Sequence, residues 1–292
     1  MQNAEAVCGL LEQAAEAMLS ADNRRGSVVR LPARGRLIVT GDLHDNPFHL
    51  RKLLRLAKLD TSPDHHLILQ EMIHGERLLN GMDFSHRMLI KGAQLVCEYP
   101  HQVHPLLANH ELSQMTGVGV SKGAGNSVDL FNDALQFVYG DRCEEVAEAI
   151  NAFVRAMPLA LISEGGVFCA HSLPAERMMR HFDETVFDRE LTDEDYRKPH
   201  GAAHLLVWGR DYSQDQVAKL AEARNVKLFC LGHEHAEMGL EMRMPQVLVL
   251  NTDHERAAAL PLDLAAVPEA EEALPGAIPL NALPEGEERG DG

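Results

Sequence analysis

Five polar clusters along the chain combine carboxylate, amide and imidazole groups, and each cluster follows a hydrophobic run. Their members are Asp42 and His44, then Glu71, then Asn109 and His110, then His171, and last His233 and His235. Histidine is the commonest metal ligand and the only side chain that titrates unaided near neutral pH. One histidine after a strand is usually an ordinary loop residue, but five such clusters are improbable as independent coincidences. Together they indicate a single metal-binding site.

The hydrophobic runs before these clusters predict β-strands whose ends meet at the site. The predicted strands cover residues 27–31, 36–40, 66–70, 103–107, 159–163, 167–170, 226–231 and 247–250. The paired glycines at positions 165 and 166 predict a β-hairpin. In open α/β sheets, ligands bind outside the carboxyl ends of the strands, where loops can aim several side chains at one point.

Helices are predicted between most of these strands. They cover residues 3–20, 47–59, 84–98, 128–138, 144–156 and 214–223. Pro47 suits the first turn of the second helix. Asp45 is placed either to cap that helix or to accept a ring N–H from a ligating histidine. The alternation of strands and helices, with a few adjacent strand pairs, predicts an α/β sandwich with mixed sheets.

The composition divides the chain into three parts. Residues 1–35 are predicted to form a helix and a connection packed on the main domain, which spans residues 36–262. Residues 263–292 are rich in proline, alanine and glutamate. We predict that this last part is a disordered acidic tail, because it cannot bury enough apolar surface to offset the cost of ordering.

The formal charge of the 292 residues is −17, of which −7 comes from residues 261–292 and −10 from the rest. This balance argues against nucleic-acid or anionic-membrane partners, because both need a basic surface. Five cysteines without a Cys-x-x-Cys pair predict reduced thiols. The sequence has neither a secretory signal pattern nor an apolar stretch long enough to cross a bilayer. It therefore predicts a soluble, cytoplasmic protein.

The order and spacing of the clusters resemble the calcineurin-like metallophosphoesterases, and most closely the PPP-type serine/threonine protein phosphatases. That family carries Gly-Asp-x-His, Gly-Asp-x-x-Asp-Arg-Gly and Gly-Asn-His-Glu, followed by isolated histidines. This chain has Gly-Asp-Leu-His at residues 41–44, Gln-Glu-Met-Ile-His at 70–74 and Ala-Asn-His-Glu at 108–111. The resemblance covers roughly residues 36–250, and it implies a sandwich of two mixed β-sheets flanked by helices.

The resemblance also implies two divalent transition-metal ions and a bridging hydroxide that attacks phosphorus in line. The mixed donor set suits Mn, Fe or Zn rather than a thiolate-selected metal. The implied ligands of the first ion are Asp42, His44, Glu71 and His235. The implied ligands of the second ion are Glu71, Asn109, His171 and His233.

Three further residues receive roles from the resemblance and from phosphate chemistry. His110 is the implied general acid that protonates the leaving alkoxide. Phosphate oxygens need cationic forks, for which arginine is best suited. Arg210 and Arg77 are therefore the candidates for binding the substrate phosphate.

The second motif departs from the family pattern. Glu71 stands where the family has its bridging Asp, and His74 stands where the family has the Asp that orients the general acid. The arginine is displaced by two residues, to Arg77. Glutamate can still bridge, but its extra methylene moves the carboxylate by more than about 1 Å. A misplacement of that size lowers rates on the order of a hundredfold.

Three functions are compatible with these residues. The first is a metal-dependent phosphomonoesterase that acts on phosphorylated proteins. The second is a hydrolase of nucleotides, dinucleoside polyphosphates or other small phosphoesters. The third is a degenerate homologue that binds metal or phosphoproteins without turnover.

Overall fold

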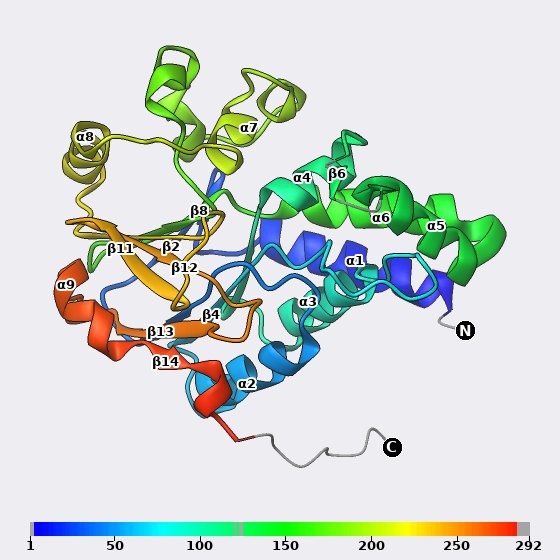
Figure 1. Cartoon of the computed structure of the whole chain (residues 1–292), viewed down its shortest axis with the longest axis horizontal. Helices are drawn as coiled ribbons and strands as arrows, with labels where there is room; N and C mark the ends of the chain where they lie inside the picture. The colour runs from blue at the N-terminus through cyan, green and yellow to red at the C-terminus, as the bar shows by residue number, and fades with distance from the viewer. Residues whose placement is uncertain (1–2, 120, 123–124, 285–292) are drawn as a thin grey trace.

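The computed structural model describes residues 3–119, 121–122 and 125–284, and it contains two large β-sheets, with α1, α5 and α6 to one side of them (Figure 1). The larger sheet has the strand order β1-β2-β8-β9-β10-β12-β11, and the smaller has the order β14-β13-β3-β4-β5. The strands of the larger sheet are β1 (Arg24–Arg25), β2 (Val28–Leu31), β8 (Ala160–Ser163), β9 (Val167–Ala170), β10 (Leu228–Leu231), β11 (Leu240–Met244) and β12 (Val247–Leu250). Those of the smaller sheet are β3 (Arg36–Val39), β4 (His65–Gln70), β5 (Val103–Leu106), β13 (Ala258–Asp263) and β14 (Ile278–Pro279).

Both sheets mix parallel and antiparallel pairs. In the smaller sheet β3, β4 and β5 run parallel, while β13 is antiparallel to β3. In the larger sheet β9, β10 and β12 run parallel, and β8 and β9 form the predicted antiparallel hairpin. A third, two-stranded ribbon joins β6 (Ser121–Lys122) and β7 (Gly125–Asn126).

The central strands β8, β9, β10 and β12 are buried on both faces, which explains their nearly continuous apolar runs. Alternate residues of β9 and β10 face the smaller sheet, and the residues between them pack on the outer layer. Cys169 and Cys230 lie in the inner layer with Leu37 of β3, whereas Phe168 and Phe229 lie in the outer layer. All five of these side chains are fully buried.

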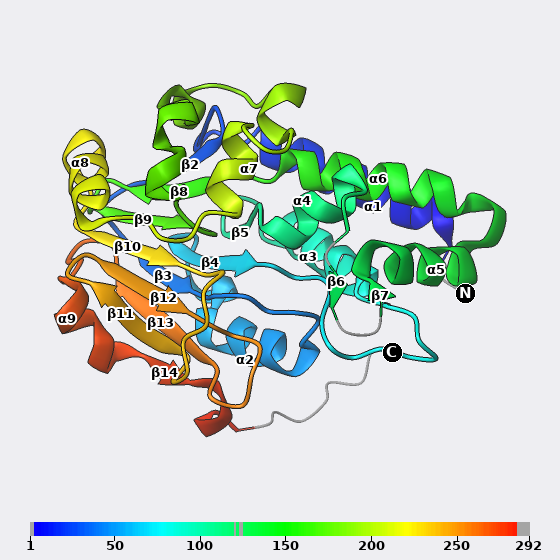
Figure 2. The ribbon, with the colours of Figure 1, turned by 45° about the horizontal axis from the view of Figure 1, so that its top comes forward.

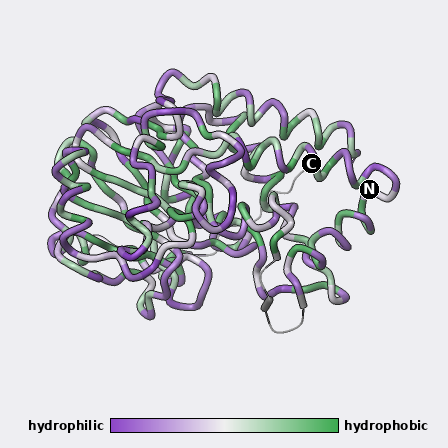
Figure 3. The backbone as a smooth tube through the Cα atoms, turned by 90° about the horizontal axis from the view of Figure 1, so that it is seen from above, coloured by the Kyte–Doolittle hydropathy of each residue, from purple (hydrophilic) through white to green (hydrophobic). Residues whose placement is uncertain are grey.

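Nine α-helices are found in the described part of the chain, and the longer ones cover the sheets and extend beyond them (Figure 2). They are α1 (Ala4–Leu19), α2 (Pro47–Ala57), α3 (His86–Glu98), α4 (Asn109–Thr116), α5 (Ser127–Tyr139), α6 (Cys143–Ala156), α7 (Ala202–Val207), α8 (Gln214–Arg224) and α9 (Ala270–Ala273). Helix α2 packs on β3 and β4, while α1 packs against α3 and α6. Hydrophobic residues are concentrated in the strands, whereas hydrophobic and hydrophilic residues alternate along the helices (Figure 3). No helix among the described residues is both long and apolar enough to cross a membrane.

The two mixed sheets flanked by helices confirm the predicted fold class. The prediction of a disordered tail from residue 263 is wrong for residues 263–284. This segment continues from β13 into α9 and then into β14, which pairs with β13. Leu264, Ala270 and Leu280 are fully buried. The average composition of this segment gives no sign of these few apolar residues, which cover the edge of the smaller sheet. The remaining tail residues, 285–292, lie outside the described residues.

Truncation within this segment is expected to destabilise the protein. A chain ending at Leu264 loses β14 and the buried side chain of Leu280, and full burial of one leucine stabilises by about 1.5–3 kcal/mol. A chain ending at Pro284 keeps both and serves as the control. Urea unfolding should show a lower midpoint for the first chain only. Equal midpoints would mean that the segment contributes nothing to stability.

His86 is a buried imidazole away from the polar clusters. Its ring is fully buried, and its centroid lies 6.0 Å from that of Phe84 and 5.9 Å from those of Phe131 and Tyr139. Neither ring nitrogen has a hydrogen-bond partner within the part of the chain that the structure describes. Burial, helped by the charge of Arg87, lowers the pKa of His86 from 6.5 to about 4.

The depressed pKa of His86 makes stability fall as the pH falls. Between pH 6.5 and 4 the unfolded chain binds a proton at this histidine that the folded chain does not. The cost is at most about 1.4 kcal/mol per pH unit, or about 2 kcal/mol at pH 5. His86→Phe fills the aromatic surroundings and removes the titration. Urea unfolding at pH 7, 6 and 5 should therefore show a steeper loss for the wild type. The same slope for both proteins would refute this role of His86.

Candidate metal centre

The five polar clusters lie at the carboxyl ends of β3, β4, β5, β9 and β10. Asp42 forms isolated bridges to Gln70 and to Asn251, so the loop after β3 is tied to strands of both sheets. The backbone N–H of His44 donates to the Glu71 carbonyl at 2.8 Å, and that of Gly232 donates to the His171 carbonyl at 3.0 Å. These bonds hold the loops against one another.

Several residues of these loops adopt the left-handed backbone conformation. The φ angles are 45° at His44, 41° at Glu71, 58° at His74 and 67° at His233. Non-glycine residues in this region cost on the order of 1–3 kcal/mol each and cluster at functional sites. A Cβ at Gly232 would lie 2.4 Å from Asp42 Oδ1, so a larger residue there would displace this carboxylate.

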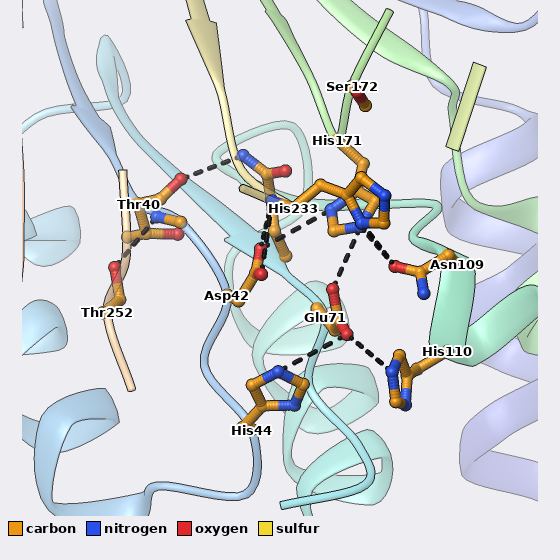
Figure 4. A network of polar contacts seen from close by, with 12 residues as sticks. Thr40, Asp42, His44, Glu71, Asn109, His110, His171, Ser172, His233 and Thr252 are labelled. Atoms are coloured by element: carbon orange, nitrogen blue, oxygen red, sulfur yellow. Dashed lines mark hydrogen bonds and ion pairs between the residues drawn. The ribbon is translucent and has the colours of Figure 1, made fainter. Parts of the chain in front are cut away.

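Two groups of side chains could each hold a metal ion, and they share one residue. The first group is Asp42, His44 and Glu71, and the second is Glu71, His171 and His233. Within each group the ligand atoms lie within 4.8 Å of one another. Figure 4 shows the Glu71 carboxylate between His44 on one side and His171 on the other.

The donor atoms of the second group are closely packed. Glu71 Oε2 lies 3.0 Å from His171 Nε2. Asn109 Oδ1 lies 2.6 Å from His171 Nε2 and 3.1 Å from His233 Nδ1, which brings the amide into the same group. On the other side, Glu71 Oε1 lies 3.4 Å from His44 Nε2 and 3.2 Å from His110 Nε2.

Burial and mutual charge set the protonation of the carboxylates. Burial, and then the charge of Glu71, raises the pKa of Asp42 to about 7. Burial also opposes ionisation of Glu71, but His44 and His171 outweigh it and hold the pKa of Glu71 well below its usual value. Glu71 is therefore a buried anion at neutral pH.

Burial and neighbouring charges also shift the pKa values of the imidazoles. Burial lowers the pKa of His171, but Glu71 overcomes this and raises it. Burial, followed by the charges of His171 and Arg210, lowers the pKa of His233 to about 2. His233 Nε2 is a buried nitrogen with no hydrogen-bond partner among the described residues. Neutral imidazole, amide and carboxylate donors fit divalent transition metals, so the residues present match the implied cations.

His235 is not brought to the site. It is exposed, belongs to neither metal-binding group, and its ring centroid lies 5.5 Å from that of His254. The chain turns at this point, since the backbone N–H of Glu234 donates to the Gly232 carbonyl at 2.7 Å. That turn separates His235 from His233.

The two arginines lie at the edge of the site. Arg210 is exposed, and its charge acts on His233. Arg77 donates to Asp45 Oδ2 at 2.8 Å and lines a cavity of about 390 Å³ together with His44. The cap of α2 is Asn46, which accepts from the backbone N–H of His49 at 3.0 Å. The prediction that Asp45 caps this helix is therefore wrong.

Two carboxylates near the site were not predicted from the sequence. Glu111 Oε1 accepts from the backbone N–H of Met72 at 2.7 Å and so fixes the residue after Glu71. Burial, and then the charge of Glu71, raises the pKa of Glu111 to about 7. Asp83 lies behind the site and binds His74. Glu111 belongs to a motif that the sequence displays, whereas Asp83 lies in a loop with no local signal.

Comparisons with known proteins agree with this geometry. The model of the calcineurin-like phosphoesterase family matches residues 35–237. A serine/threonine phosphatase from Saccharomyces cerevisiae, described as similar to human phosphatase PP5, is a structural neighbour with a TM-score of 0.67 and 13% identity, over 90% of this chain and 84% of that one. A cold-active protein-tyrosine phosphatase from a psychrophilic Shewanella has a TM-score of 0.60 and 14% identity, over 86% and 80%.

No curated protein sequence matches significantly. The two structural likenesses are too low in identity to show more than a common fold, but the family match spans most of the chain. The chain therefore belongs to the calcineurin-like phosphoesterase family and is a metal-dependent phosphoester hydrolase.

Proposed function

We propose that the protein hydrolyses phosphomonoesters at a dinuclear metal centre, in the manner of a serine/threonine protein phosphatase. The observation that carries this proposal is the position of Glu71, whose carboxylate belongs to both metal-binding groups. A carboxylate shared by two cations is the arrangement that two-metal hydrolysis needs. The cytoplasmic location stays a prediction, as does the choice among Mn, Fe and Zn.

We assign the ligands from the two groups and their contacts. Asp42, His44 and Glu71 would hold the first ion. Glu71, His171 and His233 would hold the second, with Asn109 added because its oxygen contacts both imidazoles. When bound, two divalent cations supply Lewis acidity and a water-derived nucleophile at neutral pH.

The other residues act on the substrate. His110 presents Nε2 to the centre, 3.2 Å from Glu71 Oε1, and would protonate the leaving oxygen. Arg210, whose charge acts on His233, and Arg77, which lines a cavity with His44, would bind phosphate oxygens. Arg77 is tethered by Asp45, which restricts the directions in which its guanidinium can point.

A cavity beside the centre favours a substrate larger than phosphate itself. Its volume is about 780 Å³, and it is lined by Leu112, Met115, Tyr196 and Trp208, with Lys198 among its charged residues. The Trp208 ring centroid lies 6.1 Å from that of His233, so the cavity adjoins the second group. Apolar walls with a cation suit a phosphorylated side chain and its peptide, and they also suit a nucleotide.

The experiment that tests the function combines metal analysis with parallel assays. Protein reconstituted with Mn²⁺, Fe²⁺ or Zn²⁺ should hold two equivalents and should hydrolyse a chromogenic phosphate ester. Phosphopeptides and dinucleoside polyphosphates are then assayed side by side. Faster hydrolysis of phosphopeptides supports the proposal, and faster hydrolysis of dinucleotides favours the small-molecule alternative. Two bound ions without turnover of any ester would identify a non-catalytic homologue.

Removing His233 and removing His235 should have different effects on metal content. His233→Ala deletes a buried imidazole of the second group, so the protein should lose about one equivalent. His235→Ala changes an exposed side chain outside both groups and should keep both equivalents. Elemental analysis after dialysis measures both. Loss of metal from His235→Ala would instead show that His235 is a ligand, as the sequence resemblance implies.

A further inference from the structure

The cavity of about 780 Å³ beside the second metal-binding group has one apolar wall and one charged wall. Helix α4 contributes the apolar wall, with Leu112, Met115 and Val118. Helix α7 lies against α4 (Figure 2) and also contacts η5, a short 3₁₀-helix over Asp193–Tyr196. Three of the four charged residues that line the cavity come from η5 and the residues directly after it, and the fourth comes from α6.

This cavity is more basic than the protein as a whole. Its charged lining residues are Arg155, Arg197, Lys198 and Asp193, whereas the chain has a formal charge of −17. Arg155 Nη1 lies 2.8 Å from Asp193 Oδ1. Arg197 Nη1 lies 2.5 Å from Glu194 Oε1. Lys198 is exposed and forms no ion pair with the residues that the structure describes. It is therefore the cation of this cavity that is available to a ligand.

The backbone on which Lys198 stands is held in place. The backbone N–H of Gly201 donates to the Arg197 carbonyl at 2.7 Å. The neighbouring Tyr196 is buried, and its hydroxyl donates to the Arg155 carbonyl at 3.3 Å. A fixed backbone limits the region that the Lys198 ammonium can reach, so its charge stays at this cavity.

Contacts between rings limit the distance from Lys198 to the metal centre. The Trp208 ring centroid lies 6.1 Å from that of His233 and 6.2 Å from that of His204. Burial, and then the charge of Lys198, lowers the pKa of His204, so Lys198 lies near this outer ring. The two imidazoles are thus no more than about 12 Å apart, which an extended peptide covers in three to four residues at about 3.3–3.6 Å each.

We infer that Lys198 makes the protein select phosphopeptides that carry an acidic side chain three or four residues from the phosphorylated one. The inference rests on the proposed function, which places the phosphate to be removed at the metal centre. Lysine is a compact point charge that suits a single carboxylate, whereas bidentate binding of a second phosphate uses arginine. Both arginines of the cavity are already paired with carboxylates. The cavity therefore favours an acidic peptide over a nucleotide.

The test compares two phosphoserine peptides. One has glutamate and the other has lysine at the third and fourth positions on either side of the phosphoserine. The wild type should hydrolyse the glutamate peptide with the lower KM. Lys198→Glu replaces an attraction with a repulsion, and each is worth a few-fold in affinity for exposed charges. The ratio of kcat/KM for the glutamate peptide to that for the lysine peptide should therefore fall by about tenfold. A ratio cancels any general loss of activity.

Lys219→Glu is the matched control, because it changes the net charge by the same amount elsewhere. Lys219 is exposed on α8 and lines a separate cavity of about 380 Å³. Its ratio should equal that of the wild type. An equal fall in both variants would reflect the charge of the whole molecule and overturn the inference. Equal KM values for the two peptides in the wild type would also overturn it and leave the proposed function intact. If Lys198→Glu weakens only the hydrolysis of dinucleoside polyphosphates, the cavity binds nucleotides and the inference is wrong.

Trp208 provides a measurement that needs no turnover. It is the only tryptophan of the chain, and it lines the cavity. A glutamate peptide with a non-hydrolysable phosphonate in place of phosphoserine should change the fluorescence of the Zn²⁺-loaded wild type. The Kd from this titration should rise severalfold in Lys198→Glu and stay unchanged in Lys219→Glu. No fluorescence change, or one Kd for all three proteins, would overturn the inference. Failure of the wild type to hydrolyse any ester would overturn the proposed function instead, and the titration would still report binding in the cavity.

Discussion

Replacing Glu71 with glutamine is expected to abolish the binding of both metal ions and to lower turnover by about a thousandfold. Glu71 is the one residue common to the two metal-binding groups of the described chain, and its side chain is almost fully buried. Glutamine keeps the size of the side chain and removes its charge. Metal ions contribute several kcal/mol of charge stabilisation in the transition state, and about 4 kcal/mol corresponds to a thousandfold in rate.

The control for this substitution is Glu111→Gln. Glu111 is also a buried glutamate, and its Oε1 accepts from the backbone N–H of Met72, a bond that glutamine can still accept. This variant should retain two equivalents of metal by elemental analysis. If Glu71→Gln retains both ions as well, the shared carboxylate is not needed and the dinuclear assignment fails.

Glu71→Asp tests whether the backbone has adapted to the longer side chain. The family pattern has aspartate here, so the variant restores the usual ligand type. The local backbone is nevertheless fixed, because Glu71 has a φ of 41° and its carbonyl accepts from the backbone N–H of His44 at 2.8 Å. The shorter side chain should therefore withdraw the carboxylate from both ions and lower kcat/KM on the order of a hundredfold. Wild-type activity in Glu71→Asp would show that the site readjusts freely.

The fold could be predicted from the sequence wherever the signal was local. Strand β9 was predicted over its observed residues, and β4 was predicted to within one residue, because both are short apolar runs ended by polar motifs. Strand β13 was not predicted. It contains Pro261, which has no backbone N–H to donate. Only Ala258 and Ala259 of β13 pair with β14, so Pro261 removes no hydrogen bond to that strand.

In the candidate site, too, some residues could be predicted from the local sequence, whereas others depend on contacts between distant parts of the chain. Glu71 and His171 could be predicted because each directly follows a strand, and Asp42 because it lies three residues after the end of β3. His235 falls outside both metal-binding groups of the described residues, and the tight turn after Gly232 that precedes it is not specified by the sequence alone. The contact between Asp83 and His74 depends on a loop that returns nine residues after His74 and carries no periodic pattern. Contacts made by loops across the fold are therefore the part that needed the structure.

Replacing His110 with alanine is expected to separate metal binding from catalysis of poor leaving groups. His110 belongs to neither metal-binding group, so the variant should keep two equivalents of metal. Losing a general acid costs about a hundredfold to ten-thousandfold where protonation of the leaving oxygen matters. The loss should therefore be large for alkyl phosphates and small for p-nitrophenyl phosphate. A series of esters with graded leaving-group pKa measures this as a steeper dependence of kcat/KM on that pKa. An unchanged rate on alkyl phosphates would show that another group donates the proton.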